Sequence, residues 1–252
     1  MILDKFRIDR QVAVVTGGTQ GLGRAIAEAL AEAGADIAAV SRRSNPELEH
    51  TVRSLGRNYY HHAADLTQRA QSRRVIPAVV EKLGDVNILV NNAGIIRRAP
   101  AKDYSESDWD ATLEIDLNAA FILSQAAGHL MLAQGKGKII NIASVISFQG
   151  GLNVSAYAAA KHGIAGLTKA LANDWAKHGI NVNALAPGFF STELTEALQK
   201  DPQRSESITG RTPAGRWGSP ADLAGAAVFL ASPASDFVHG VIIPVDGGWM
   251  AW

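Results

Sequence analysis

Short apolar runs alternate along the chain with longer segments in which apolar residues recur every three or four positions. The first run, residues 12–16, is short and β-branched, which favours a buried strand. After it, Leu22, Ile26 and Leu30 follow helical spacing until Gly34, a residue typical of a helix end. Further strand candidates are 36–40, 59–64, 86–91, 138–143, 180–185 and 241–245. Predicted helices separate them, one ending near Leu55 and others lying around 68–83, 105–133, 155–178 and 220–231.

Seven strands separated by helices of crossover length predict parallel pairing with right-handed connections. The fold class expected is α/β, a doubly wound parallel sheet of Rossmann-like type with helices on both faces. No low-complexity linker, charge block or repeat divides the chain, so a single domain over residues 1–252 is expected. Ligands of such sheets bind beyond the carboxyl ends of the strands, so candidate chemistry is sought just after each strand.

Composition narrows the function classes. Lys and Arg number 24 and Asp and Glu number 24, a balance that argues against a nucleic-acid binder. The absence of cysteine excludes disulfides, cysteine-based metal sites and a cysteine nucleophile. The longest uncharged run, residues 139–160, carries polar side chains and is a poor membrane span, so a cytoplasmic protein is expected. His61 and His62 are adjacent on a predicted strand and face opposite sides, so no metal site is expected.

Glycines cluster directly after the first strand. Residues 16–23 read TGGTQGLG and open into a helix, while Ile26 stands where the last glycine of G-x-G-x-x-G would be. A tight turn of this kind lets the backbone approach a pyrophosphate and points unpaired helix N–H groups at the anion. A plain strand–helix turn would have the same composition, so the turn alone does not establish a dinucleotide site.

Other motifs follow in a fixed order along nearly the whole chain. They are the T-G-x-x-x-G-x-G turn at 16–23, Asn91-Asn-Ala-Gly94, Asn118, Ser144 with Tyr157-x-x-x-Lys161, and Pro187-Gly188. Each motif is common alone, but together and in this order they resemble the short-chain dehydrogenase/reductase family. The resemblance implies an enzyme that transfers hydride between a nicotinamide dinucleotide and a carbinol or carbonyl carbon.

The resemblance also implies which residues hold the dinucleotide. The pyrophosphate would lie on Gly17, Gly21 and Gly23, Asp65 would contact adenine, and Asn91 would support the adenosine half. The remaining contacts implied are Thr19, Gln20, Leu22, Leu66, Ala93, Gly94, Tyr157, Lys161, Pro187, Gly188 and Thr192, the last suiting the nicotinamide carboxamide. Asp65 fits a helix cap before the segment from Thr67 equally well.

The end of the second strand bears on which cofactor is used. In the family, an acidic residue there binds the ribose 2′-hydroxyl and favours NAD. Here the place is held by Ser41, followed by Arg42 and Arg43. A guanidinium can bind a 2′-phosphate through two hydrogen bonds, so NADP(H) is predicted in preference to NAD(H), with Arg42 as the main contact. Solvated loop arginines are the alternative.

Tyr157 and Lys161 lie four residues apart in a helical segment, which places both side chains on one face. A free tyrosine titrates at about pH 10, and a neighbouring ammonium together with the positive nicotinamide ring is expected to lower its pKa. The resemblance implies that Tyr157 is the general acid/base, Ser144 orients the reacting oxygen, and Lys161 holds the ribose. It further implies that Asn118 completes the proton path through a water. A surface helix pair and an ordinary helix amide are the alternatives for Tyr157–Lys161 and for Asn118.

Substrate residues are less determined. Several local stretches look like sugar-acid members of the family, among them Asn91–Arg98, Ser147–Gly151, Pro213–Gly218 and Val245–Trp249. Arg97 or Arg98 could bind a carboxylate and Gln149 could bind hydroxyls, although both arginines could equally be solvated or lie in subunit contacts. Residues 189–211 are expected to form a substrate lid, and the family suggests a homotetramer. Trp249 and Trp252 are expected to pack against the core or a subunit.

Two other functions share many of these features. A 3-oxoacyl-carrier-protein reductase would use the same catalytic set with NADPH and would need a basic patch for its acidic carrier. A cofactor-sensing binding protein without chemistry would be expected to lack Tyr157 or Lys161, and both are present with Ser144.

Overall fold

The computed structural model describes residues 1–251, and Trp252 lies outside the described residues. Its strands form one parallel sheet in the order β3-β2-β1-β4-β5-β6-β7. The strands are β1 (Val12–Thr16), β2 (Asp36–Ser41), β3 (Tyr59–Ala63), β4 (Ile88–Asn91), β5 (Gly137–Ile142), β6 (Ile180–Pro187) and β7 (Ile242–Val245). The strand order reverses between β1 and β4, so a crevice is expected at the carboxyl ends of these two strands. The predicted fold class is confirmed.

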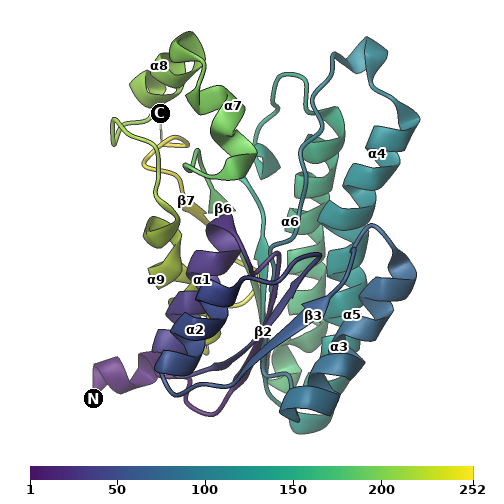
Figure 1. Cartoon of the computed structure of the whole chain (residues 1–252), viewed down its shortest axis with the longest axis vertical. Coiled ribbons are helices and arrows are strands. Elements are labelled where there is room, and N and C mark those ends of the chain that lie inside the picture. Colours follow the sequence, from purple (N-terminus) through teal and green to yellow (C-terminus); the bar gives the residue numbers. More distant parts are fainter. Residues whose placement is uncertain (252) are drawn as a thin grey trace.

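Helices cover both faces of the sheet (Figure 1). One layer holds α1 (Gly21–Glu32), α2 (Pro46–Ser54) and α9 (Pro220–Ala231), and the other holds α3 (Arg69–Leu83), α4 (Glu106–Leu113), α5 (Ala119–Gln134) and α6 (Ser155–Trp175). The short helices α7 (Glu196–Gln199) and α8 (Pro202–Arg211) follow β6 and lie beyond the end of the sheet (Figure 1).

Alternation along the central strands explains the two layers. In β1, Ala13 and Val15 belong to the core beneath α1 and α9, whereas Val12 and Val14 belong to the core beneath α3 and α5. All five residues of β1 are buried, which is the pattern expected of a parallel strand covered on both faces.

The predicted element boundaries mostly agree with the structure within two residues. The main difference lies in the predicted helix 105–133, which is α4 and α5 joined by a π-helical stretch, Glu114–Asn118. A π-helical turn adds a residue to the helix and changes which side chains face inward. Here it accompanies a buried carboxylate, Asp116, between α4 and α5.

Across residues 1–251, the helices are all too short or too polar to cross a membrane.

Candidate active site

The glycine turn after β1 packs closely against neighbouring protein atoms, which leave no space for a side chain at Gly17 or Gly23. Gly17 has a φ of +61°, and a Cβ there would lie 2.8 Å from the Asn92 amide nitrogen. A Cβ on Gly23 would collide with the Gly17 carbonyl oxygen. Gly21 has a φ of +52°, and a Cβ there would lie 3.6 Å from Thr192 Cγ2. The turn is therefore packed against Asn92, and Thr192 lies next to Gly21.

Thr16 joins the ends of β1 and β4. Its hydroxyl oxygen accepts from the backbone N–H groups of Asn92 and Ala93, each at 2.9 Å. The Asn92 side-chain amide in turn donates to the Thr16 carbonyl oxygen at 2.8 Å. These bonds hold the Asn-Ala-Gly segment against the glycine turn at the point where the strand order reverses.

Asn91 and Asp65 were predicted to contact the adenosine half of the dinucleotide, and the side chains of both form hydrogen bonds with other protein groups. The buried Asn91 amide donates to Asn141 at 2.9 Å and to Ser124 at 3.0 Å, so its side chain faces the interior and not the crevice. Asp65 accepts from the Thr67 N–H and hydroxyl at 3.0 and 2.8 Å, and it does not cap α3, whose N-cap residue is Gln68. Leu66 is buried.

Ser41, Arg42 and Arg43 lie where β2 ends. The Ser41 hydroxyl lies 2.6 Å from the Arg43 carbonyl oxygen and 3.0 Å from His61 Nε2 on β3. Arg42 and Arg43 are exposed, and neither has an ion-pair partner among residues 1–251. Two unpaired guanidiniums at this edge suit an anion.

Ser144, Tyr157 and Lys161 come together where β5 ends. Ser144 is buried directly after β5, and its hydroxyl accepts the Ile146 N–H at 3.1 Å. Tyr157 and Lys161 both lie on α6, with Lys161 Nζ 5.4 Å from the centre of the Tyr157 ring. Lys161 is 5% exposed, and its ammonium donates to the Ile142 carbonyl oxygen at 2.9 Å.

A carboxylate that the sequence motifs do not predict lies next to Lys161. Lys161 Nζ lies 3.2 Å from Asp116 Oδ1, and both side chains are buried. Burial acts to lower the pKa of Lys161, but Asp116 and Tyr157 outweigh it and the pKa is raised.

Without the nicotinamide ring, the surroundings of Tyr157 raise its pKa, although Lys161 acts to lower it as predicted. Burial raises the pKa of Tyr157; Lys161 opposes burial, and the Asp116 charge adds to it. The expectation counted the ammonium and the nicotinamide ring and did not include the Asp116 carboxylate.

The Asn118 side chain is bound within its own π-helical stretch. Its amide donates to Glu114 Oε2 at 2.8 Å, and Glu114 is bound by Arg69 through both carboxylate oxygens. Asn118 lines a hollow on the outside of α3 and α5, together with Phe121 and His129. Sequence reasoning missed Asp116, although an acid between the apolar residues Ile115 and Leu117 was a signal of a buried charge.

The two candidate substrate arginines have different surroundings. Arg97 is held by Asp108 at 3.5 Å. Arg98 has no ion-pair partner among residues 1–251, and its neighbour Ala99 donates to the Asn153 carbonyl oxygen at 3.1 Å, just before α6. Burial and the nearby Arg204 of α8 lower the pKa of Arg98, while Tyr157 acts to raise it. Gln149 is partly buried after Ser144.

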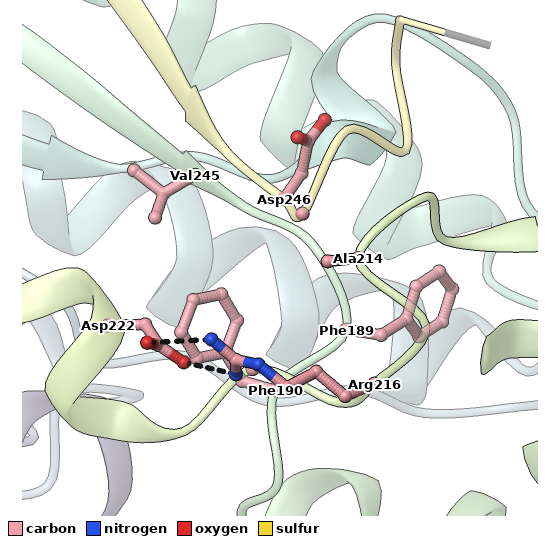
Figure 2. Close-up of a pocket in the computed structure, with 9 residues that line it drawn as sticks. Phe189, Phe190, Ala214, Arg216, Asp222, Val245 and Asp246 are labelled. Carbon is pink, nitrogen blue, oxygen red and sulfur yellow. Dashed lines mark hydrogen bonds and ion pairs between the residues drawn. The ribbon is translucent and has the colours of Figure 1, made fainter.

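The segment predicted as a lid begins with anchored residues. Phe189 packs against Trp249 and Trp217, with ring centres 4.6 and 5.9 Å apart, and Phe190 is buried and pairs with Gly218. Figure 2 shows both phenylalanines at a pocket that Arg216 and Asp222 border. Gly188 is pressed against Asp246, where a Cβ would come within 2.8 Å of its Cα. Trp249 is buried, as expected, and Arg211 lies 3.9 Å from its ring centre.

Within residues 1–251, no group of three or more His, Asp or Glu side chains is arranged to hold a metal ion. His61 contacts Ser41, and His62 lies 3.1 Å from the Tyr60 hydroxyl.

A family model described as enoyl-(acyl carrier protein) reductase matches residues 17–250. The chain belongs to the short-chain dehydrogenase/reductase family. It is accordingly an NAD(P)-dependent oxidoreductase.

Other members of the short-chain dehydrogenase/reductase family are similar over their full length. The chain is 49% identical over 252 residues to 2-dehydro-3-deoxy-D-gluconate 5-dehydrogenase of Escherichia coli, with 100% of each chain covered. A crystal structure of a putative 2-deoxy-D-gluconate 3-dehydrogenase from Agrobacterium tumefaciens with bound NADP is 48% identical, with a TM-score of 0.93, covering 98% of this chain and 99% of that one. A gluconate 5-dehydrogenase from Burkholderia cenocepacia in complex with NADP and tartrate is 44% identical, with a TM-score of 0.94 and 100% of both chains covered.

Proposed function

We propose that the protein transfers hydride between NADP(H), in preference to NAD(H), and the secondary alcohol or ketone of a sugar acid or keto-deoxy sugar acid. The observation that carries this proposal is that Ser144, Tyr157 and the buried Lys161 lie together where β5 ends. The glycine turn lies at the same edge of the sheet. That arrangement combines a proton donor, a cation and an anion-binding turn.

Each residue has a distinct part in the proposed reaction. The bound dinucleotide supplies or accepts the hydride. In reduction, the Tyr157 hydroxyl gives its proton to the substrate oxygen, and in oxidation the phenolate takes the proton back. The Ser144 hydroxyl orients that oxygen without taking a full charge. Lys161 places its ammonium beside Tyr157 and offers a donor to a ribose hydroxyl.

The preference for NADP(H) is assigned to Arg42, with Arg43 and Ser41 beside it. An exposed guanidinium without an internal partner can bind a 2′-phosphate, while no carboxylate follows β2 to repel one. The NADP bound to the Agrobacterium and Burkholderia relatives supports this assignment. NAD(H) is the alternative.

The substrate class is argued from Arg98. Arg97 already pairs with Asp108, whereas Arg98 lies near Tyr157 and has an uncompensated charge. A carboxylate bound by Arg98 would place the carbon chain of a sugar acid alongside the Tyr157 hydroxyl, and Gln149 could bind its hydroxyls. The names of the relatives support a sugar acid.

The proposal also covers the domain organisation, the assembly and the location of the protein. Residues 1–252 are proposed to form a single domain in which 189–211 covers the substrate. A cytoplasmic homotetramer is proposed as well. Phe121 on α5, an aromatic residue 44% exposed beside the hollow at Asn118, supports a subunit contact on that face. Light scattering of the purified protein would test the assembly, and cell fractionation its location.

The decisive experiment is a substrate panel with both cofactors, followed by the absorbance of the reduced nicotinamide. Sugar acids, neutral polyols and 3-oxoacyl thioesters are compared. Turnover of sugar acids with NADP(H) is expected. Turnover confined to oxoacyl thioesters would favour the carrier-protein reductase, and binding of NADP(H) without turnover of any substrate class would contradict the enzyme proposal.

A further inference from the structure

Two histidines of β3, His61 and His62, take no part in the proposed hydride transfer. They pair with consecutive residues of β2, so their side chains lie on opposite faces of the sheet. His61 shares its face with Ser41, because alternate residues of a strand point the same way. Its Nε2 atom lies 3.0 Å from the Ser41 hydroxyl. A histidine of the outermost strand is therefore connected to the end of β2, where the cofactor preference is assigned.

The directions of the hydrogen bonds at Ser41 follow from the number of hydrogens present. The Ser41 hydroxyl lies 2.6 Å from the Arg43 carbonyl oxygen, and a carbonyl can only accept, so Ser41 donates its one hydrogen there. The Ser41 oxygen then accepts from His61, whose Nε2 atom must carry a proton. A chain of hydrogen bonds thus runs from β3 through the end of β2 to the backbone at Arg43.

The loop that carries Arg42 and Arg43 is held at both ends. At its start, the Ser41 hydroxyl binds the Arg43 carbonyl oxygen. At its end, the Asn45 side-chain amide donates to the Thr19 carbonyl oxygen of the glycine turn at 2.8 Å, and its Oδ1 accepts two backbone N–H groups in the first turn of α2. The two exposed guanidiniums therefore extend from a short loop that is attached to β3 on one side and to the glycine turn on the other.

We propose that His61 is a positioning residue for cofactor selection: its hydrogen bond to Ser41 fixes the loop of residues 42–43, which presents two guanidiniums to the 2′-phosphate of NADP(H). The inference rests on the proposed function, which assigns the NADP(H) preference to that loop. A long, exposed arginine loses rotamer freedom when it binds an anion, and a loop that is already ordered avoids the further cost of ordering its backbone. The effect of His61 is therefore expected on affinity for the 2′-phosphate and not on the chemical step.

The test uses two probes that differ only in the 2′-phosphate, adenosine 2′,5′-bisphosphate and adenosine 5′-monophosphate. The dissociation constant of each is measured by isothermal titration calorimetry on the full chain. His61→Leu removes the donor to Ser41. It is expected to weaken binding of the 2′,5′-bisphosphate by about threefold to tenfold, the value of one uncharged hydrogen bond, and to leave binding of the 5′-monophosphate unchanged.

Two further variants separate the hydrogen bond from general damage to β3. His61→Gln, whose amide nitrogen can take the place of Nε2, should restore the wild-type ratio of the two dissociation constants. His62→Leu is the matched control, because His62 faces the other side of the sheet and contacts the Tyr60 hydroxyl, and no change in the ratio is expected there. In steady-state kinetics, His61→Leu should raise KM for NADPH with kcat unchanged, whereas a merely structural role would affect NADPH and NADH alike.

The outcomes that count against His61 and against the cofactor assignment are different. An unchanged ratio of the two dissociation constants in folded His61→Leu would overturn the role of His61 while the NADP(H) preference stands. If that variant does not fold, Ser41→Ala decides, because it cuts the same connection, and an unchanged ratio there overturns the proposal equally. A wild type that does not prefer the 2′,5′-bisphosphate would contradict the cofactor assignment itself, and the role of His61 with it.

Discussion

Arg216 and Asp222 form an ion pair through two hydrogen bonds, with Nη1 to Oδ2 at 2.6 Å and Nη2 to Oδ1 at 3.0 Å (Figure 2). Asp222 also accepts the Ser219 N–H at 2.7 Å at the start of α9. The pair therefore connects the segment after the proposed lid to the first turn of a helix that packs on the sheet.

This pair makes stability depend on pH. The Arg216 hydrogen bonds and the Ser219 N–H lower the pKa of Asp222 from 3.8 to about 2. A carboxyl with a lowered pKa in the folded state stabilises that state fully above its unfolded pKa, and the effect is lost as the pH falls through the folded value. Asp222→Asn is expected to reduce the free energy of unfolding at pH 7 by about 1 kcal/mol, a modest value because solvent screens the exposed pair.

Urea unfolding at several pH values checks this prediction. The difference between Asp222→Asn and the wild type should shrink from pH 4 downward, as the Asp222 carboxyl takes up its proton. Glu196→Gln serves as the control, because Glu196 pairs with Lys200 on the surface of a short helix and caps nothing. A difference that grows on acidification would contradict the assignment.

Tyr157→Phe tests the proton transfer. Loss of the phenolic hydroxyl is expected to reduce kcat by about a hundredfold to ten-thousandfold, the range of general acid/base catalysis. The dissociation constant for NADPH, measured by fluorescence, should change little. Tyr60→Phe, on β3 beside His62, should retain turnover. Near-full activity of Tyr157→Phe would remove Tyr157 from the mechanism.

Arg42→Ala tests the choice of cofactor. Loss of a charged hydrogen-bond donor to a 2′-phosphate costs about 1.5–3 kcal/mol, so kcat/KM for NADPH should fall by about tenfold or more while that for NADH stays the same. Arg43→Ala is expected to have the smaller effect. An unchanged ratio of the two cofactors in Arg42→Ala would rule out this arginine as the discriminating contact.

Arg98→Ala tests carboxylate recognition, with Arg97→Ala as its matched neighbour. Steady-state kinetics on a keto acid and on its neutral analogue should show a rise in KM for the acid only, and only in Arg98→Ala. Arg97→Ala should behave like the wild type because Arg97 pairs with Asp108. Equal losses on both substrates would argue that Arg98 supports the loop and not the ligand.

The sheet was predictable from the sequence because the central strands are short apolar runs and the helices between them repeat apolar residues at helical spacing. The glycine turn and the set of Ser144, Tyr157 and Lys161 were predictable because their chemistry depends on local spacing or on strand ends. The structure brings Lys161 and Tyr157 to one face of α6, as the four-residue spacing indicates.

The environment of Lys161 could not be read in the same way. Regular helical spacing from residue 105 to 133 does not reveal a π-helical stretch, and that stretch decides whether Asp116 or Asn118 faces inward. The pairing of Arg97 with Asp108, which leaves Arg98 uncompensated, depends equally on contacts between loops that no spacing encodes.

The bonds of Thr16 have a consequence for the energetics of ligand capture. Because one hydroxyl accepts two amide protons from the neighbouring loop, the rim of the crevice is rigid before any dinucleotide arrives. Binding of the dinucleotide then orders little additional backbone, so the loss of conformational entropy on binding is small. The affinity is therefore determined mainly by the contacts that the dinucleotide makes. Thr16→Val, which preserves shape and deletes the acceptor, would loosen that rim and weaken capture of the nucleotide with the reactive centre untouched.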